Sequence, residues 1–185
     1  MNDHDRVRAA SADRVAALIG LHFPGPLAER LADTPRFASR FYAAAANRLE
    51  DLPTLDARQS VALALDVGGL QAAAIKAGAV WHAAAIARIV DGAARRSVVE
   101  AIGPDLYRLA LEGYGLAPHG GSTDLLEVDL VEAARREGEG CWAAWRSAQP
   151  TPVATRLSLL DSDVSPQATH RDYGPAIVAW LLDRT

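Results

Sequence analysis

The sequence predicts an all-α fold, a single compact domain of about seven or eight helices over residues 1–185. Half of the residues are hydrophobic, yet aromatic side chains make up only 6% of the chain. Alanine, leucine, arginine and glutamate recur throughout; these are strong helix formers, whereas strands favour β-branched and aromatic residues. Prolines and glycines divide the chain into segments of helical length. We therefore expect a bundle of helices joined by short connections.

The first residues predict a tail and two short helices. Residues 1–10 are charged and are expected to form a flexible tail. A helix is expected over 11–19 and must end before Pro24, because proline cannot continue a helix. Pro26 then suits the first turn of a second helix over 26–32.

Cap residues mark the next two helices. Thr34 is a cap residue, and Pro35 follows it at the first helical position. Together they predict a helix over 35–52. Asp56 with Gln59 three residues later resembles a capping box and predicts the start of the following helix.

An alanine-rich segment predicts one long helix over 71–90, after a break or kink at Gly68-Gly69. On a helical wheel, His82 lies on the aliphatic face and Trp81 on its flank. A lone histidine on an aliphatic face is usually a packed core or boundary residue, and this is our interpretation of His82. The alternative is a pocket near Trp81 and His82 in an α-helical enzyme or small-ligand-binding protein.

Three further helices are expected before the C-terminal region. They are predicted over 93–103, 104–115 and 124–149. Asp124 with Glu127 resembles a cap for the third helix. Gly138 and Gly140 weaken its middle by roughly 1 kcal/mol each relative to alanine.

The C-terminal region predicts one extended segment and one more helix. Leu157 and Leu159 alternate with polar neighbours, which predicts a short extended arm over 156–160. Residues 161–172 are polar and predict an irregular loop. Gly174-Pro175 is expected to open the last helix.

Charge and cysteine content disfavour several classes of protein. The net charge of −4 disfavours a nucleic-acid-binding protein, for which a basic domain is typical. The single cysteine, Cys141, allows no intramolecular disulfide and fits a reducing compartment. No apolar run reaches the ~20 residues of a membrane span, and the N-terminus lacks a secretory signal pattern. We expect a cytoplasmic protein without direct membrane insertion.

The sequence offers no strong motif for catalysis, a cofactor or a metal. The closest local grouping of ligand types, His170-Arg171-Asp172, falls in the predicted loop and supplies too few ligands for a zinc site. Cys141 is interpreted as a small buried hydrophobe. The glycine pairs lack the spacing of phosphate-binding loops. We expect no catalytic, cofactor-binding or metal-binding residue.

Two basic doublets and two tryptophans are the candidates for contacts with a protein partner. Isolated doublets are more often ordinary surface charge, and tryptophan is enriched in cores as well as at interfaces. The candidate residues are Arg95, Arg96, Arg135, Arg136, Trp142 and Trp145.

Two blocks of the sequence resemble one family. The first block, GAVWHAAAIARIVDGAARRSVVEAIGPDLYRLALE at 78–112, joins a Trp-His helix to a short basic helix, Ile-Gly-Pro-Asp-Leu and an aliphatic helix. In the second block, GEGCWAAWRSAQPTPVATRLSLL at 138–160, a Trp-containing helix leads through proline to Arg-Leu-x-Leu. Both blocks resemble the SctK family, the cytosolic accessory proteins of bacterial type III secretion systems.

The resemblance implies a non-enzymatic adaptor of the cytoplasmic sorting platform. Such a protein links the inner-membrane ring protein to the pods that carry the C-ring-like component. It implies protein partners, no cofactor and no catalytic residues, and a location at the cytoplasmic face of the secretion apparatus.

Overall fold

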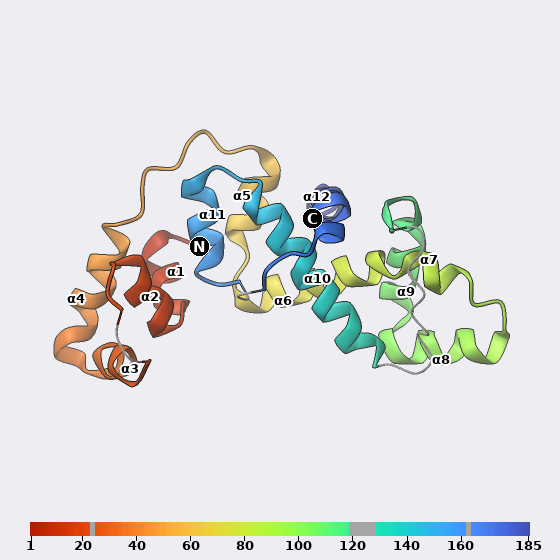
Figure 1. Ribbon diagram of the computed structural model, residues 1–185, viewed down its shortest axis with the longest axis horizontal. Coiled ribbons are helices and arrows are strands. Elements are labelled where there is room, and N and C mark those ends of the chain that lie inside the picture. The colour runs from red at the N-terminus through yellow and green to blue at the C-terminus, as the bar shows by residue number, and fades with distance from the viewer. Residues whose placement is uncertain (23–24, 119–128, 162–163) are drawn as a thin grey trace. The chain divides into compact units, whose positions relative to one another are not determined.

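The structure is a computed structural model that describes residues 1–22, 25–118, 129–161 and 164–185. Every regular element within these ranges is helical (Figure 1), which confirms the all-α prediction. The α-helices are α1 Asp3–Ala9, α2 Ala12–Leu18, α3 Gly25–Asp33, α4 Pro35–Ala46, α5 Ala57–Ala64, α6 Val67–Trp81, α7 Ala83–Ala87, α8 Gly92–Ile102, α9 Pro104–Glu112, α10 Leu130–Ser147, α11 Thr151–Ser158 and α12 Ala168–Leu182. A short 3-10 helix, η1, spans Tyr114–Leu116.

The described ranges contain twelve α-helices, more than the seven or eight expected. One helix, α1, lies within the predicted tail, and another, α11, covers most of the predicted arm. The expected long helix over 71–90 is divided at His82, which separates α6 from α7.

The chain divides into two compact units. Unit 1 contains Met1–Val67 together with Gln149–Asp161, and unit 2 contains Gly68–Ala148 together with Ser162–Thr185. The organisation of residues 1–185 as a single domain stays a prediction.

In unit 1, α4 packs against α1, α2 and α3, and α11 packs against α5. The capping box predicted at the start of α5 is confirmed. The Asp56 side chain accepts from the Gln59 N–H, and the Gln59 side chain accepts from the Asp56 N–H. The prediction that α4 starts at Pro35 is also confirmed. The aliphatic and aromatic interior of the unit includes Val7, Val15, Ala28, Phe41, Ala45, Ala62, Val153 and Leu157.

The prediction of a flexible tail over 1–10 is wrong for α1. The Asn2 side chain caps this helix by accepting from the Asp5 N–H at 2.8 Å. Val7 and Arg6 are buried at 0% and 1% exposure. Burial of this face fixes α1 to the unit, although its composition is mostly charged.

Arg6 joins three helices of unit 1. Its guanidinium donates to the carbonyl oxygen of Leu63 in the last turn of α5 and, at 3.3 Å, to that of Arg156 in the last turn of α11. Arg156 in turn pairs with both carboxylate oxygens of Asp3 in α1, at 2.7 and 2.6 Å. A cation at two helix C-termini is favourable, because the last carbonyls lack intrahelical partners and carry partial negative charge.

Arg6→Met should therefore destabilise the protein by about 3 kcal/mol, since it leaves buried carbonyl groups without their donor. Arg8→Met is the matched control, because Arg8 lies on the same helix and is exposed. Urea unfolding would measure both variants. Equal free energies of unfolding for the two would contradict the anchoring role of Arg6.

The extended arm predicted over 156–160 is also wrong, because α11 continues to Ser158 and Leu159 is its C-terminal cap with helical φ and ψ. Leu157 and Leu159 alternate, but Val153 and Leu157 are also four residues apart. This helical spacing is the one that the core uses, and both side chains are at most 1% exposed. A short apolar pattern is compatible with both the strand period and the helical period. Burial against the rest of the unit selects the helix.

In unit 2, α10 packs along α12, and a second cluster of apolar side chains joins α7, α8 and α9. The cap predicted at Asp124 and Glu127 lies outside the described residues. Within them, the Asp129 side chain caps α10 by accepting from the Val131 and Glu132 N–H groups. The predicted break at Gly68-Gly69 is wrong, because α6 begins at Val67 and contains both glycines.

Two glycines allow the backbones of α6 and α10 to touch. A β-carbon at Gly78 would overlap the carbonyl oxygen of Ala134, and one at Gly138 would overlap that of Ala74. Glycine lowers helix propensity, but here it removes the atom that would separate the two helices. Gly138 therefore lies within a continuous α10. Its low helix propensity weakens the helix there, as the sequence predicts.

Gly138→Ala should destabilise the protein by about 2–3 kcal/mol, because overpacking outweighs the gain in helix propensity. Gly115→Ala is the control, since no heavy atom lies within 4 Å of its added β-carbon. We expect the control to change the free energy of unfolding by less than ~0.5 kcal/mol. A Gly138→Ala variant as stable as the wild type would show that the helices separate freely.

The predicted boundary of the last helix needs correction. Helix α12 begins at Ala168, inside the predicted loop over 161–172, and continues through Pro175. Gly174 packs against the backbone of Cys141, 2.8 Å from the position that its β-carbon would occupy. Tertiary contacts thus hold about two turns of helix on the N-terminal side of a proline that would otherwise open the helix.

Candidate functional site

Three helices of unit 2 bring together the polar and aromatic groups that the sequence left apart. The carboxylate of Glu137 on α10 lies 2.9 Å from Nε2 of His170 on α12. The Trp81 ring at the end of α6 stacks on the imidazole of His170, with centroids 4.6 Å apart and planes at 33°. Tyr173 completes the group by meeting Trp81 edge-on at 6.4 Å.

His170 was expected in a solvated loop, but it lies in the first turn of α12 and is only 5% exposed. Its Nδ1 accepts from the backbone N–H of Gln167 at 3.2 Å. The proton is therefore on Nε2, which donates to Glu137. Gly140 makes room for the ring, since a β-carbon there would lie 2.5 Å from Cε1 of His170.

Both ring nitrogens of His170 are thus occupied by protein groups. A general base needs a nitrogen within hydrogen-bond reach of the proton that it removes. In this arrangement neither nitrogen offers that capacity to a substrate. The Glu137–His170 pair joins α10 to α12 and has a structural role.

Cys141, one turn after Glu137 on α10, is fully buried. Burial raises the pKa of its thiol, and the negative charge of Glu137 adds to that effect. Only the thiolate is an effective nucleophile, so this cysteine is chemically inert. The interpretation of Cys141 as a small buried hydrophobe is confirmed.

His82 lies between α6 and α7 and is 6% exposed, which confirms its interpretation as a core or boundary residue. Burial lowers the pKa of its imidazole, and the charge of Arg136 acts in the same direction. Glu137 and the backbone of Ala133 oppose this shift. Among the described residues, Nε2 of His82 has no hydrogen-bond partner. The neutral imidazole is therefore the form that the core accepts.

Acidification should destabilise the wild-type protein more than the His82→Leu variant. An unfolded histidine titrates near pH 6.5, whereas the pKa of folded His82 is lower. As the pH falls below about 6.5, the unfolded state binds a proton that the folded state does not, so the free energy of unfolding falls. Above that pH both states are neutral and this contribution is constant.

Urea unfolding at pH 7.5, 6.5 and 5.5 would measure the effect. We expect the wild type to lose about 1 kcal/mol more than the variant between pH 6.5 and 5.5, within the limit of ~1.4 kcal/mol per unit for one proton. At pH 7.5 the variant should lie within ~2 kcal/mol of the wild type. Parallel pH profiles would contradict the assignment of a neutral, buried imidazole.

The described ranges contain no group of three or more His, Cys, Asp or Glu side chains placed to hold a metal ion. In those same ranges, no helix has the length and apolar character needed to cross a membrane.

The first predicted partner-binding doublet, Arg95 and Arg96, is exposed on α8. The guanidinium carbon of Arg95 lies 5.4 Å from the ring centroid of Tyr107 on α9, a cation–π distance. The Tyr107 ring packs against Arg95, and both arginines remain exposed to solvent. We call Arg95, Arg96 and Tyr107 the α8 surface.

The second doublet, Arg135 and Arg136, is engaged along α10. Arg135 pairs with Glu132, with Nε 2.9 Å from a carboxylate oxygen, and also with Glu139. Arg136 lies 3.2 Å from Glu137. These are neighbouring pairs on one helix, each of which contributes only a few tenths of a kcal/mol.

Trp142 and Trp145 were candidates for docking, but both rings are buried, at 2% and 5% exposure. Their centroids are 5.5 Å apart and their planes meet at 76°, an edge-to-face pair. The structure therefore places them in the core, where such pairs add to hydrophobic burial. They present almost no ring surface to a partner.

The sequence analysis missed two features of unit 1. One is a pocket of about 240 Å³ beside Arg6, lined mainly by aliphatic side chains. It depends on contacts between residues more than 50 positions apart, so no local pattern indicates it. The other is the outer face of α4, which carries Arg36, Phe37 and Arg40. Its signal was present in the sequence, because no acidic residue occurs between Asp33 and Glu50.

Comparison of the chain with protein-family models, with curated proteins and with solved structures finds no match.

Proposed function

We propose that this chain is a non-enzymatic adaptor of a bacterial type III secretion system. It would link the cytosolic domain of the inner-membrane ring protein to the pod component of the sorting platform. The sequence resemblance to the SctK family supports this proposal. Its first block, 78–112, covers the end of α6 and continues through α9, and its second block, 138–160, covers most of α10 and α11.

The observation that carries the proposal is a contrast between core and surface in unit 2. Among the side chains that could take part in catalysis, His170 and Cys141 are buried, and Glu137, which is partly exposed, is paired with His170. The α8 surface instead presents two adjacent arginines beside an aromatic ring. Arginine and tyrosine are enriched at the energetic centres of protein interfaces. This distribution fits a protein that works by binding other proteins.

The test is co-elution of the purified chain with the two partners encoded in the same operon, the cytosolic domain of the ring protein and the pod component. We expect at least one partner to bind at micromolar concentration. Arg95→Glu combined with Arg96→Glu should weaken that binding at least 10-fold, because reversed charges meet an acidic partner surface with repulsion.

Lys76→Glu combined with Arg171→Glu is the matched control, since it makes the same change in net charge at exposed positions of α6 and α12. We expect this control to bind within about twofold of the wild type. Absence of binding to both partners would overturn the adaptor proposal. An equal loss of partner affinity in both double variants would leave the adaptor proposal intact. It would show that the α8 surface has no specific role in binding.

A further inference from the structure

A second basic surface lies in unit 1, on the outer face of α4. This helix has twelve residues and buries Phe41 and Ala45, at 6% and 0% exposure, against the unit. Arg36 and Arg40 are one turn apart on the opposite side and are exposed. Arg36 and Arg40 form a short basic stripe, whereas Arg48 lies beyond the end of the helix and, twelve residues after Arg36, is about 120° away from it around the helical axis.

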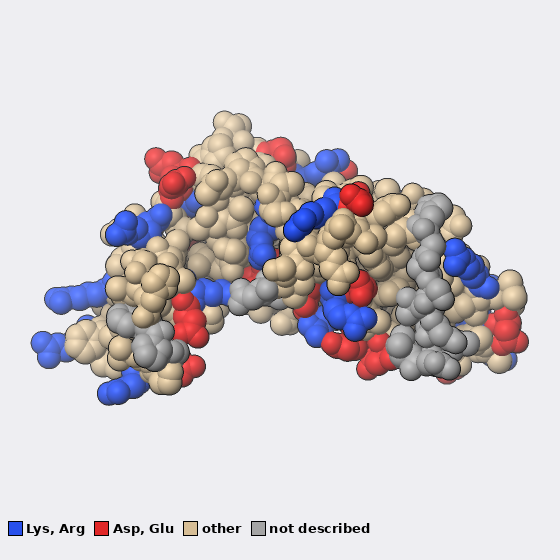
Figure 2. Space-filling view, viewed as in Figure 1, with Lys and Arg blue, Asp and Glu red and all other residues tan. Residues whose placement is uncertain are grey.

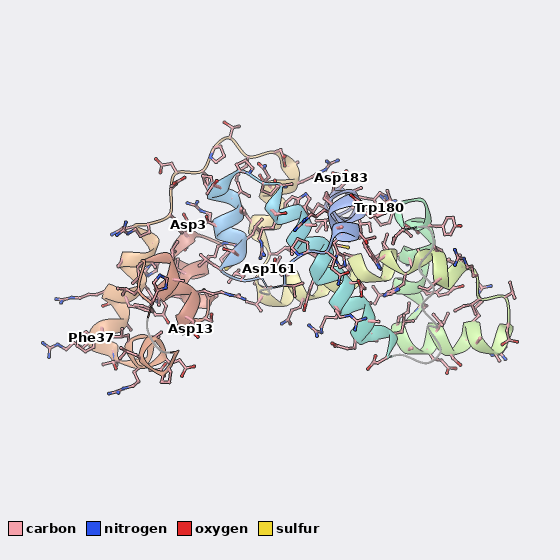
Figure 3. The ribbon with its side chains drawn as sticks, in the orientation of Figure 1. Asp3, Asp13, Phe37, Asp161, Trp180 and Asp183 are labelled. Atoms are coloured by element: carbon pink, nitrogen blue, oxygen red, sulfur yellow. The ribbon has the colours of Figure 1, made fainter. Side chains whose placement is uncertain are left out.

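An aromatic ring accompanies these cations. Phe37 is 46% exposed, and the guanidinium carbon of Arg36 lies 6.0 Å from its ring centroid. Figure 3 shows Phe37 at the periphery of the unit, well separated from Asp13 on α2. A half-exposed phenylalanine flanked by arginines has the composition of an interface anchor with a polar rim.

The charge on this face has one sign over a limited length. Helix α4 contains no acidic residue, and Figure 2 shows basic side chains projecting where Figure 1 places α3 and α4. The stripe of Arg36 and Arg40 spans about 6 Å, one helical turn, at the rise of an α-helix. Asp33 precedes it and Glu50 follows it, and both carboxylates are exposed.

These limits define the partner. A long polyanion such as nucleic acid, or an anionic bilayer, would extend past the stripe and meet the carboxylates of Asp33 and Glu50. A short segment would not. A stripe of one helical turn matches a short helical segment with acidic side chains around one apolar position.

We propose that the exposed surface of α4 formed by Arg36, Phe37 and Arg40 is a docking surface for a short acidic amphipathic helix of a partner protein. Phe37 fills the apolar centre of that contact, and the arginines pair with the carboxylates of the partner helix. This inference rests on the proposed adaptor function and adds a binding surface in unit 1 to the one in unit 2.

The test uses the full chain and a synthetic peptide as the probe. The probe is a fluorescein-labelled, helix-forming peptide of about 18 residues with glutamates on one face and leucines on the other. A matched peptide carries glutamine in place of every glutamate. Fluorescence anisotropy at 50 and 200 mM salt gives the affinities, and circular dichroism confirms that each variant is folded.

We expect the glutamate peptide to bind at least 10-fold more tightly than the glutamine peptide at the lower salt concentration. The difference should shrink at the higher one, because salt screens exposed charges. Arg36→Glu with Arg40→Glu should weaken binding at least 10-fold, and Arg36→Gln with Arg40→Gln by an intermediate factor. Phe37→Ala should weaken it about fivefold or more at both salt concentrations.

The control pair Lys76→Glu with Arg171→Glu should bind the peptide within twofold of the wild type. An equal loss of peptide affinity in this control would overturn the proposal, because the effect would then depend only on the net charge of the protein. Tighter binding to single-stranded DNA or to phosphatidylserine vesicles than to the peptide would overturn it as well. An unchanged affinity in Phe37→Ala would exclude the apolar anchor and with it the proposed contact.

Failure of this inference is distinguishable from failure of the adaptor function. If the operon partners bind the wild type and the α4 variants equally, α4 is not a docking surface and the adaptor function stands. If the acidic peptide binds through α4 while neither operon partner binds, the docking surface stands and the type III secretion assignment falls.

Discussion

The direct contact between the backbones of α6 and α10 is the constraint on which the arrangement of unit 2 depends. Because Gly78 and Gly138 have no side chains, the two helices approach until backbone meets backbone. That approach places Glu137, next to Gly138, within reach of His170 on α12. It also brings His170 against Trp81, at the end of α6. A single methyl group at either glycine would alter all of these distances together.

In each unit, one buried cationic or imidazole side chain is bound by helix ends or by a carboxylate. Arg6 binds carbonyl groups in the last turns of α5 and α11, and His170 binds the N–H at the start of α12 and the carboxylate of Glu137. These contacts hold helices in register and consume the capacity of each group to bind anything else. The groups left for recognition are therefore on the outside, where arginines accompany Tyr107 in one unit and Phe37 in the other.

The sequence predicted the fold class, the Asp56–Gln59 capping box and the burial of His82 and Cys141, because these follow from local composition and period. It failed where distant contacts override local preference. The Leu157–Leu159 pattern suits a strand, and burial beside α5 made it a helix. Pro175 suits a helix start, yet contacts of His170 and Gly174 with α10 hold about two turns of helix before it. Polar composition suggested loops at α1 and at the start of α12, where a few buried polar side chains supply the order. The α4 surface was predictable, since a stretch without acidic residues is visible in the sequence.

The division of the chain has a consequence for its synthesis. The polypeptide crosses between the units three times, at 67/68, 148/149 and 161/162. Unit 1 cannot close until α11 has left the ribosome, and by then all of unit 2 except α12 has already emerged. The two cores must therefore be completed nearly together, once α11 and α12 have both emerged. For the same reason no single cut separates one unit from the other, and even a cut at 161/162 leaves unit 1 joined to most of unit 2.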